Sequence, residues 1–358
     1  MNTETLLSKA KEADTAKVTI IIAPRERFEQ ATMSLTSLFE TIDMPVSLIY
    51  VDGATPEPIA SDIRKLIESH GHTYIRSERF LSPNQARNLA MKKVNPGAKY
   101  IVFADNDVLF TPGWLSSMVN CAEETGAGLV SPTILVGPEG RMPDLKIHHA
   151  GGALSIHPQS GGHVVFSRQH GHEHLRYLDV KDQLVRRETD CTEFHTVLTR
   201  KDMLDQIGPF DEQIVGFSDE VDMALLARQC GWKIWFEPAS VITYATGKKL
   251  TWNDLPYFCA RWEGSRCINA EKHFYAKWGL KPDFDRQRRF LRDHRRHAFP
   301  FKRLQKLIGW RATVLLTTVI CQAIALTALP RFAPIRRETS NASPLRPQIG
   351  EAHASVYA

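Results

Sequence analysis

Two aspartates that follow an apolar run are the residues best suited to chemistry in this chain. Residues 100–104 are Tyr-Ile-Val-Phe-Ala, and Asp105, Asn106 and Asp107 come next. A continuous apolar run predicts a buried strand. Residues i and i+2 of an extended segment point the same way, so the two carboxylates can converge at the strand end. Two hard oxygen ligands suit Mg²⁺ or Mn²⁺ bound with the phosphates of a substrate. A plain polar strand-to-turn transition is the alternative.

Three further acids crowd the start of a predicted helix. Asp219, Glu220 and Asp222 precede the helix-forming residues 223–230, which Gly231 stops. Capping and the helix dipole explain one acid in a first turn. Repulsion among three raises their pKa values toward those useful in a general base. We therefore expect at least one of them to be catalytic.

The elements that must position these acids alternate along the chain. Apolar strands are expected at 18–23, 46–51, 73–75 and 100–104, with helices at 28–41, 58–69 and 84–93. This alternation predicts an α/β fold with a doubly wound, mainly parallel sheet. Asp52 ends the second strand, and right-handed crossovers place it on the same sheet edge as Asp105 and Asp107. Neither G-x-G-x-x-G nor G-x-x-x-x-G-K-[ST] occurs, which argues against a classical dinucleotide or P-loop site.

Six blocks in order resemble the family 2 glycosyltransferases and cover roughly residues 17–245. They are the first strand with Pro24, then residues 50–55, 84–88, 104–107, 207–212 and 218–238. The resemblance implies the nucleotide-diphospho-sugar transferase fold. It also implies a metal-dependent, inverting transfer of a sugar to a hydroxyl acceptor, such as a cell-envelope glycan or a lipid-linked acceptor.

The resemblance further implies roles for single residues. Asp52 would contact the nucleobase, and Asp105 and Asp107 would hold the metal ion of the donor diphosphate. An acid of the later block would be the base, but the order Asp219-Glu220 reverses the usual one, so Glu220, Asp219 and Asp222 all stay candidates. Many relatives carry a histidine near position 244, where this chain has Tyr244. The residues expected to bind substrate are Pro24, Arg25, Asp52, Arg87, Asn88, Asn106, Glu193 and His195.

Histidine is dense in one glycine-rich segment. Its members are His148, His149, His157, His163, His170, His172 and His174. Imidazoles suit zinc, but neither cysteine nor a regular i, i+4 spacing accompanies them, so we expect a polar loop on the acceptor side. Glu193 and His195 precede a predicted strand at 197–200, where they would bond sugar or acceptor hydroxyls or form a buried pair.

The C-terminal third is basic and then apolar. Nine basic residues lie between positions 286 and 306, and residues 312–329 are almost wholly apolar between Arg311 and Arg331. That length is near the lower limit for crossing a bilayer. We expect peripheral association with an anionic, cytoplasmic membrane face; a helix buried in protein is the alternative. Nucleic acid is not an expected partner.

The expected organisation has five parts: a flexible segment 1–16, a catalytic domain 17–250, a basic helical extension 251–310, an apolar helix 311–330 and a disordered tail 331–358. The catalytic domain divides into a nucleotide half (17–130) and an acceptor half (131–250). Six cysteines without a C-x-x-C pair favour a reducing compartment, and residues 1–16 lack the apolar core of a secretory signal. A cytoplasmic location is therefore expected.

Two other functions remain open from the sequence. A nucleotidyltransferase of similar fold would need a glycine- and lysine-rich loop after the first strand, where residues 23–27 are Ala-Pro-Arg-Glu-Arg. A non-catalytic, membrane-associated sugar-nucleotide-binding protein would explain the reversed acids and the missing histidine. The presence of both Asp105 and Asp107 argues against it.

Overall fold

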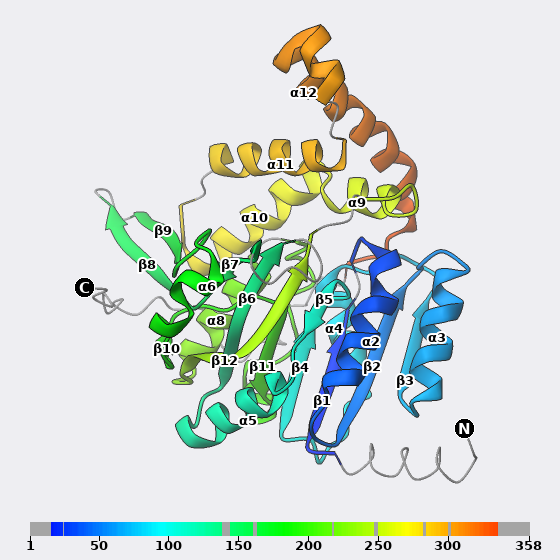
Figure 1. The fold of residues 1–358 in the computed structure, drawn as a ribbon. Coiled ribbons are helices and arrows are strands. Elements are labelled where there is room, and N and C mark those ends of the chain that lie inside the picture. Colours follow the sequence, from blue (N-terminus) through cyan, green and yellow to red (C-terminus); the bar gives the residue numbers. More distant parts are fainter. Residues whose placement is uncertain are drawn as a thin grey trace.

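The computed structural model describes residues 16–23, 25–137, 144–159, 163–216, 218–246, 250–281, 284–299 and 302–335. Pro24, expected to bind substrate, lies outside these residues, as do most of the predicted N-terminal segment and C-terminal tail. A ten-stranded sheet forms the centre of the described part, with the path β10-β12-β6-β11-β4-β1-β2-β3. Figure 1 shows this sheet with helices around it and the C-terminal helices gathered at one end.

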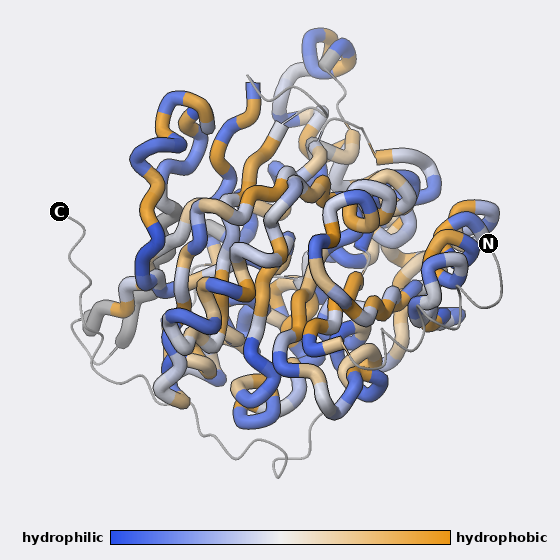
Figure 2. Tube along the Cα trace, turned by 60° about the horizontal axis from the view of Figure 1, so that its bottom comes forward, coloured by the Kyte–Doolittle hydropathy of each residue, from blue (hydrophilic) through white to orange (hydrophobic). Residues whose placement is uncertain are grey.

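Four parallel strands form one half of the sheet. They are β1 (Val18–Ile22), β2 (Val46–Gly53), β3 (Thr73–Ser77) and β4 (Tyr100–Ala104). Successive residues of a strand point to opposite faces, and two separate cores result. Ile21, Ile49 and Phe103 pack in one core, whereas Ile20, Leu48 and Val102 pack in the other. Apolar side chains on both faces explain why these strands lack hydrophobic alternation. Figure 2 shows the hydrophobic strand residues in the middle of the molecule.

Helices cover both faces, which confirms the expected doubly wound α/β fold. On one face lie α2 (Ala31–Thr41), α3 (Ile59–Ser69) and α5 (Trp114–Thr125). On the other lie α4 (Pro83–Met91), α7 (Lys201–Ile207) and α8 (Asp219–Gln229). A capping box fixes the start of α4, because the backbone N–H of Ser82 donates to Gln85 Oε1 (3.0 Å) and that of Gln85 to Ser82 Oγ (3.4 Å).

The other half of the sheet is mixed. It contains β5 (Val108–Phe110), β6 (Leu129–Gly137), β7 (Lys146–His149), β10 (Arg187–Thr189), β11 (Thr196–Arg200) and β12 (Ile234–Ala245). Strand β11 runs antiparallel between β4 and β6, while β12 is parallel to β6. Residues 196–200 therefore bring the preceding segment, with Glu193 and His195, back to the end of β4.

The structure of the histidine-rich segment differs from the prediction. We expected a polar loop, but β7 joins the central sheet, and β8 (Gly152–Gln159) and β9 (His163–His170) form an antiparallel hairpin. Cross-strand backbone pairing joins these strands, in which polar residues outnumber apolar ones. Of the seven histidines, His148 and His149 lie in β7, and His172 and His174 lie in the turn after β9.

The C-terminal extension is helical. It contains α9 (Leu255–Arg261), α10 (Gly264–Trp278), α11 (Phe284–Ala298), α12 (Lys302–Ala328) and the 3-10 helix η4 (Leu329–Arg331). Gly309 interrupts α12 with a left-handed backbone (φ 80°). Residues 331–334, which the sequence assigns to a disordered tail, instead pair with the core. Phe80 N–H donates to Arg331 O (2.9 Å), and Ala333 N–H donates to Phe80 O (2.8 Å).

Candidate active site

A cavity of about 440 Å³ lies where β4 and β11 meet the C-terminal extension. Seven of the predicted catalytic, substrate-binding and metal-binding residues line it: Arg25, Asp105, Asp107, Glu193, His195, Asp219 and Glu220. The segments that follow β1 and β4, the segment before β11 and the start of α8 supply them from positions up to 195 residues apart. The cavity therefore brings the two acidic groups of the sequence to one place.

Asp105 and Asp107 are buried at the carboxyl end of β4. Asp105 Oδ1 lies 3.2 Å from Arg25 Nε, and Asp107 Oδ2 accepts a hydrogen bond from Arg27 Nη1 at 3.4 Å. Burial and the neighbouring Asp105 raise the pKa of Asp107 to about 7, although Arg27 opposes this. Two buried carboxylates that repel each other are stabilised by a further positive charge. This pair therefore fits Mg²⁺ or Mn²⁺.

Arg25 is the cation at the centre of these acids. Burial alone would lower the pKa of Arg25, but the surrounding carboxylates, led by Asp105 and Asp219, raise it above its ordinary value. Its backbone N–H donates to Asn106 Oδ1 (3.2 Å). The Asn106 amide in turn donates to the carbonyls of Glu26 and Arg27, each at 3.4 Å. Asn106 thus holds the 25–27 loop next to Asp105 and Asp107, and its contact with substrate stays a prediction.

The three acids of α8 have different surroundings. Asp219 Oδ2 accepts a hydrogen bond from Arg87 Nη1 at 2.6 Å. Burial raises and Arg87 lowers the pKa of Asp219, with a net result well below its usual range. Asp222 accepts bonds from Lys277 Nζ and Trp278 Nε1, each at 2.8 Å, and is absent from the described cavity lining. Glu220 lines the cavity and is half-buried.

Arg87 lies beneath the cavity and is absent from its described lining. Its side chain is 1% exposed, and its Nη1 also donates to Asn84 Oδ1 at 2.8 Å. The guanidinium carbon lies 3.3 Å from the centre of the Phe194 ring. The structure thus places Arg87 as a support for Asp219. We predicted that Arg87 helps hold the nucleotide, and that role stays a prediction.

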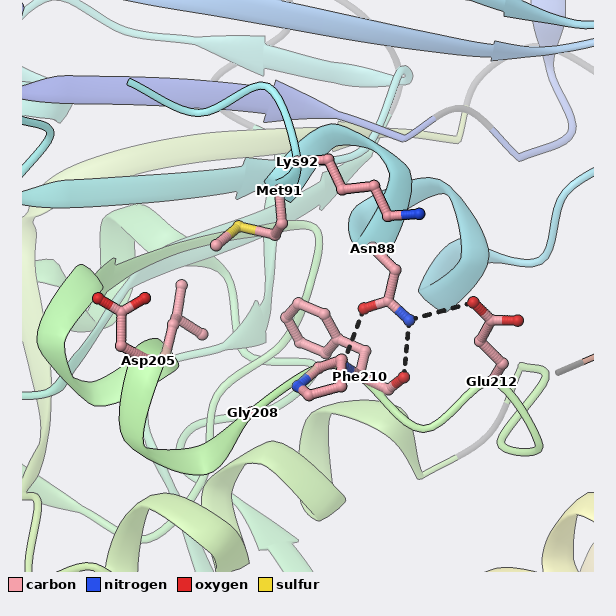
Figure 3. A pocket seen from close by; sticks show the side chains of 9 residues that line it. Asn88, Met91, Lys92, Asp205, Gly208, Phe210 and Glu212 are labelled. Atoms are coloured by element: carbon pink, nitrogen blue, oxygen red, sulfur yellow. Dashed lines mark hydrogen bonds between the residues drawn. The ribbon is translucent and has the colours of Figure 1, made fainter. Parts of the chain in front are cut away.

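Asn88 lies on a different cavity, of about 540 Å³, between α4 and α7 (Figure 3). Its Oδ1 accepts from Phe210 N (2.9 Å), while its Nδ2 donates to Phe210 O (2.8 Å) and to Glu212 Oε1 (3.3 Å). These bonds hold the turn after α7. Met91, Lys92 and Asp205 also line this cavity, but of the predicted site residues that the structure describes, Asn88 alone reaches it.

Asp52 is fully buried near the end of β2. Its Oδ1 accepts from Thr55 N at 2.7 Å, and its Oδ2 accepts from Arg76 Nη1 at 2.5 Å and from the Tyr74 hydroxyl. Both carboxylate oxygens therefore have protein donors. The contact between Asp52 and a nucleobase stays a prediction.

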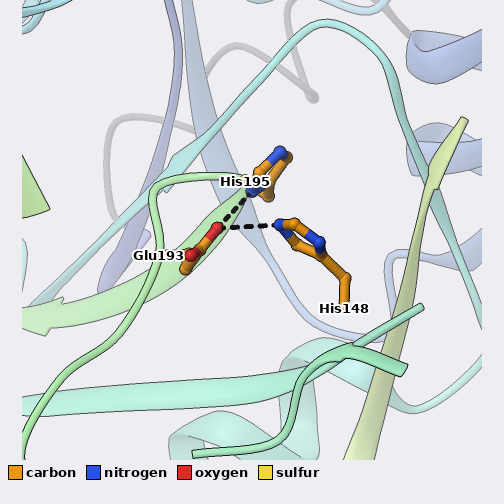
Figure 4. Close-up of side chains that lie close together, drawn as sticks. All are labelled: His148, Glu193 and His195. Carbon is orange, nitrogen blue, oxygen red and sulfur yellow. Dashed lines mark hydrogen bonds and ion pairs between the residues drawn. The ribbon is translucent and has the colours of Figure 1, made fainter. Parts of the chain in front are cut away.

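Glu193 joins two histidines across the cavity wall (Figure 4). Its Oε2 lies 3.2 Å from His148 Nε2 and 3.0 Å from His195 Nδ1. The His195 ring lies 4.4 Å from the Tyr244 ring, centre to centre. Burial, followed by the charge of Asp107, raises the pKa of Tyr244 well above its ordinary value, so its phenol stays protonated at neutral pH.

The model of the family described as "Glycosyl transferase family 2" matches residues 19–208, just over half of the chain. The chain belongs to glycosyl transferase family 2. The resemblance seen in the sequence blocks is thereby confirmed.

The individual proteins similar to this family 2 chain share a quarter or less of its aligned residues. An uncharacterized protein y4gI of Sinorhizobium fredii is 25% identical over 233 residues, which cover 62% of this chain and 24% of that protein. This chain thus spans about a quarter of the length of that relative. A crystal structure of GalNAc-T7 with UDP, GalNAc and Mn²⁺ is 14% identical in sequence, with a TM-score of 0.48. The matched region covers 77% of this chain and 54% of the GalNAc-T7 chain. The mannosyltransferase PcManGT of Pyrobaculum calidifontis, in complex with GDP-Man and Mn²⁺, is 13% identical, with a TM-score of 0.46 and coverages of 89% and 93%.

Several residues that line the 440 Å³ cavity or contact its lining were not identified from the sequence. Arg27 contacts Asp107, and Glu26 accepts a hydrogen bond from Arg261 Nη1 at 2.8 Å. The charged triplet at 25–27, shortly after the first strand, is the signal that could have identified this loop. Trp262 and Tyr275 of the extension also line the cavity. Both are aromatic residues, and aromatic side chains on helices are more often part of a core than of a ligand site. The sequence therefore did not mark them as cavity residues.

Proposed function

We propose that this chain is a glycosyltransferase that moves a sugar, with inversion, from a nucleotide-diphospho-sugar to a hydroxyl acceptor. The observation that carries the proposal is the joint presence of the Asp105–Asp107 pair and Glu220 in one cavity. An inverting displacement needs a site for the leaving diphosphate and a base for the incoming hydroxyl. Membership of glycosyl transferase family 2 supports the same reaction class.

Asp105 and Asp107 would hold Mg²⁺ or Mn²⁺, which would offset the charge of the departing diphosphate. Arg25, placed among four carboxylates, adds a fixed cation to the same region. These groups favour the bond-breaking step because charge develops on the diphosphate oxygen as the bond to the sugar lengthens.

Glu220 is the acid that we assign as the base. Its carboxylate accepts the proton of the acceptor hydroxyl as that oxygen bonds to the anomeric carbon. Asp219 is held ionised by Arg87, and Asp222 is engaged by Lys277 and Trp278. Both are therefore less suited to exchange a proton with substrate. Glu193 and His195 face the same cavity and would bond hydroxyls of the sugar or the acceptor.

We also propose that the enzyme acts at an anionic membrane surface on the cytoplasmic side, on a lipid-linked or envelope acceptor. One helix, spanning Arg303–Arg331, is long and apolar enough to cross a membrane by length and composition, and 28% of its most apolar window is buried in the protein. Basic residues of α11 and of the first part of α12 precede the apolar part of this helix. Each basic residue near an anionic surface contributes about 1 kcal/mol.

The test is release of nucleoside diphosphate from a panel of nucleotide-sugars, with Mn²⁺ and with a chelator. We expect turnover with one donor that depends on the metal. Asp107→Ala should abolish both the turnover and the metal-dependent nucleotide binding. Asp205→Ala is the matched control, because Asp205 is an exposed acid of α7 that pairs with Lys201. Turnover that persists in Asp107→Ala would overturn the metal assignment.

A further inference from the structure

Three side chains of the cavity have the types and spacing of a transition-metal site. His148 lies in β7, and Glu193 and His195 precede β11. One ligand atom from each lies within 4.8 Å of the other two. The Glu193 oxygen is 3.2 Å from His148 Nε2 and 3.0 Å from His195 Nδ1, and all three residues line the cavity.

The two separations from the Glu193 oxygen match those of ligands around one ion. Zinc binds imidazole nitrogen and carboxylate oxygen at about 2.0–2.2 Å, so ligand atoms at right or tetrahedral angles lie about 3–3.5 Å apart. Two histidines and one glutamate are also a ligand set of catalytic zinc sites. A carboxylate hydrogen-bonded by two imidazoles has similar distances, and the experiment below separates the two arrangements.

The surrounding contacts hold the ligands in place. Glu193 and His195 are two residues apart, and the backbone N–H of Asp105 donates to His195 O at 3.1 Å. The His195 ring packs at 4.4 Å against Tyr244 and at 5.1 Å against His148. Fixed ring orientation favours metal binding, because less freedom is lost when the ion is bound.

This cluster is distinct from the aspartate pair. Neither Asp105 nor Asp107 has a carboxylate oxygen within the 4.8 Å group. Tyr244 contacts both regions, since its ring packs against His195 and lies 5.0 Å from the Arg27 guanidinium carbon. Arg27 in turn contacts Asp107.

We infer that His148, Glu193 and His195 bind a divalent transition metal of the zinc class, separately from the ion of Asp105 and Asp107. Imidazole ligands favour zinc, whereas a pair of carboxylates favours Mg²⁺ or Mn²⁺. Three protein ligands leave a coordination position that faces the cavity. A water molecule or an oxygen of the acceptor fits that position.

The experiment is a metal titration of the full chain, stripped of metal and free of nucleotide. Co²⁺ reports the ligand set through its visible absorption, and Zn²⁺ affinity follows from competition with a chromophoric chelator. The wild type should bind one Zn²⁺ tightly, and the Asp105→Ala/Asp107→Ala double variant should retain it. His148→Ala and His195→Ala should each lower the affinity about a hundredfold or more, beyond the 10–100-fold typical of outer-shell changes. His294→Ala is the control, since His294 lines the same cavity outside the cluster.

Glu193→Gln provides a second test if an alanine variant fails to fold. The glutamine keeps an oxygen that can accept hydrogen bonds from the imidazoles but loses the negative charge that favours the ion. Zn²⁺ affinity should fall while circular dichroism stays unchanged. Unaltered Zn²⁺ affinity in Glu193→Gln and in both histidine variants would overturn the inference. So would loss of all Zn²⁺ binding in the double aspartate variant, because the histidines would then complete the first metal site.

Discussion

The ion pair between Arg87 and Asp219 gives the acids at the start of α8 different surroundings. Arg87 comes from α4 and Asp219 from α8, and both are buried. Leaving either charge buried without its partner is costly, so the pair fixes α8 against α4 and holds the Asp219 carboxylate in its ionised form. Glu220, the next residue, is directed to the cavity by this anchoring.

The role of Glu220 is tested by Glu220→Gln, which keeps volume but removes proton affinity. The rate should fall by about two to four orders of magnitude, while donor binding persists because the lesion is in the chemical step. The comparison is Asp222→Asn, which should lower stability more than rate because Asp222 binds Lys277 and Trp278. A nearly normal Glu220→Gln beside an inactive Asp222→Asn would show that the base is Asp222, two residues further along α8, and not Glu220.

The second prediction concerns Arg87→Met, which leaves Asp219 buried without its cation. The free energy of unfolding in urea should fall by about 3–5 kcal/mol. Arg64→Met is the control, because Arg64 is partly exposed and only 3.8 Å from the exposed Glu57. If Arg87→Met kept its stability but lost nucleotide binding, the predicted contact of Arg87 with the nucleotide would be supported.

The sequence predicted both acidic groups of the cavity, the aspartates after β4 and the acids that begin α8, because strand ends and helix starts follow from apolar patterns. It did not predict which acid is paired. Arg87 and Asp219 are 132 positions apart, and a motif does not show whether a guanidinium faces a ligand or a carboxylate. Arg87 and Asn88 therefore read as ligand contacts, although both form bonds within the protein.

At the scale of elements, α10 is joined to the turn after α7 by a cluster of charges. Asp211 Oδ2 lies 2.7 Å from His273 Nε2 and 3.3 Å from Lys277 Nζ. Burial opposes ionisation, but His273 and Lys277 lower the pKa of Asp211 to about 2. Since the pKa of Asp211 is lower in the folded state than in the unfolded state, this group favours folding above about pH 4. The contribution is lost as the pH falls toward 2.

Asp211→Asn tests this cluster. At pH 7 the free energy of unfolding should fall by about 2 kcal/mol, from roughly two pKa units at ~1.4 kcal/mol each. The variant should also lose less stability than the wild type between pH 4 and pH 2. Denaturant melts across that range provide the measurement, and parallel curves for the two proteins would contradict the assigned cause.

The parallel strands β1, β2 and β4 were predictable because each contains a long apolar run. The position of β11 was not, since its insertion between β4 and β6 depends on pairing across about 70–100 residues. Strands β7, β8 and β9 were missed because histidine and glycine hide the period-2 pattern on which strand prediction rests. Their backbone pairing is a property of the sheet, not of local composition.

At the scale of the whole molecule, α12 exposes large apolar side chains to solvent. A helix that only packs on protein would bury such side chains. Its inner face carries the small, buried Thr313, Thr317 and Cys321. Its outer face carries Leu315, Val319 and Leu326, which are 66%, 57% and 62% exposed. Exposed apolar patches of this kind mark interaction sites, and the basic residues upstream fit an anionic membrane.

The triple variant Leu315→Gln/Val319→Gln/Leu326→Gln should bind anionic vesicles more weakly than the wild type. The fraction that sediments with the vesicles should drop several-fold, because each exposed apolar side chain contributes about 25 cal/mol per Å² buried. Thr327→Gln is the matched control on the exposed surface of α12. Equal sedimentation of the triple variant and the wild type would show that these side chains do not contact lipid.

The pairing of Phe80 with residues 331–333 has a consequence for the order of events during synthesis. Phe332 packs with Phe28, Phe80 and Tyr257, so this small core draws on both ends of the described chain. The ribosome reaches Phe332 about 250 residues after Phe80, or roughly 10–50 s later at ~5–20 residues per second. Throughout that interval Phe28 and Phe80 lack their last partner. The nascent chain therefore lacks this part of its core until its helical extension has emerged.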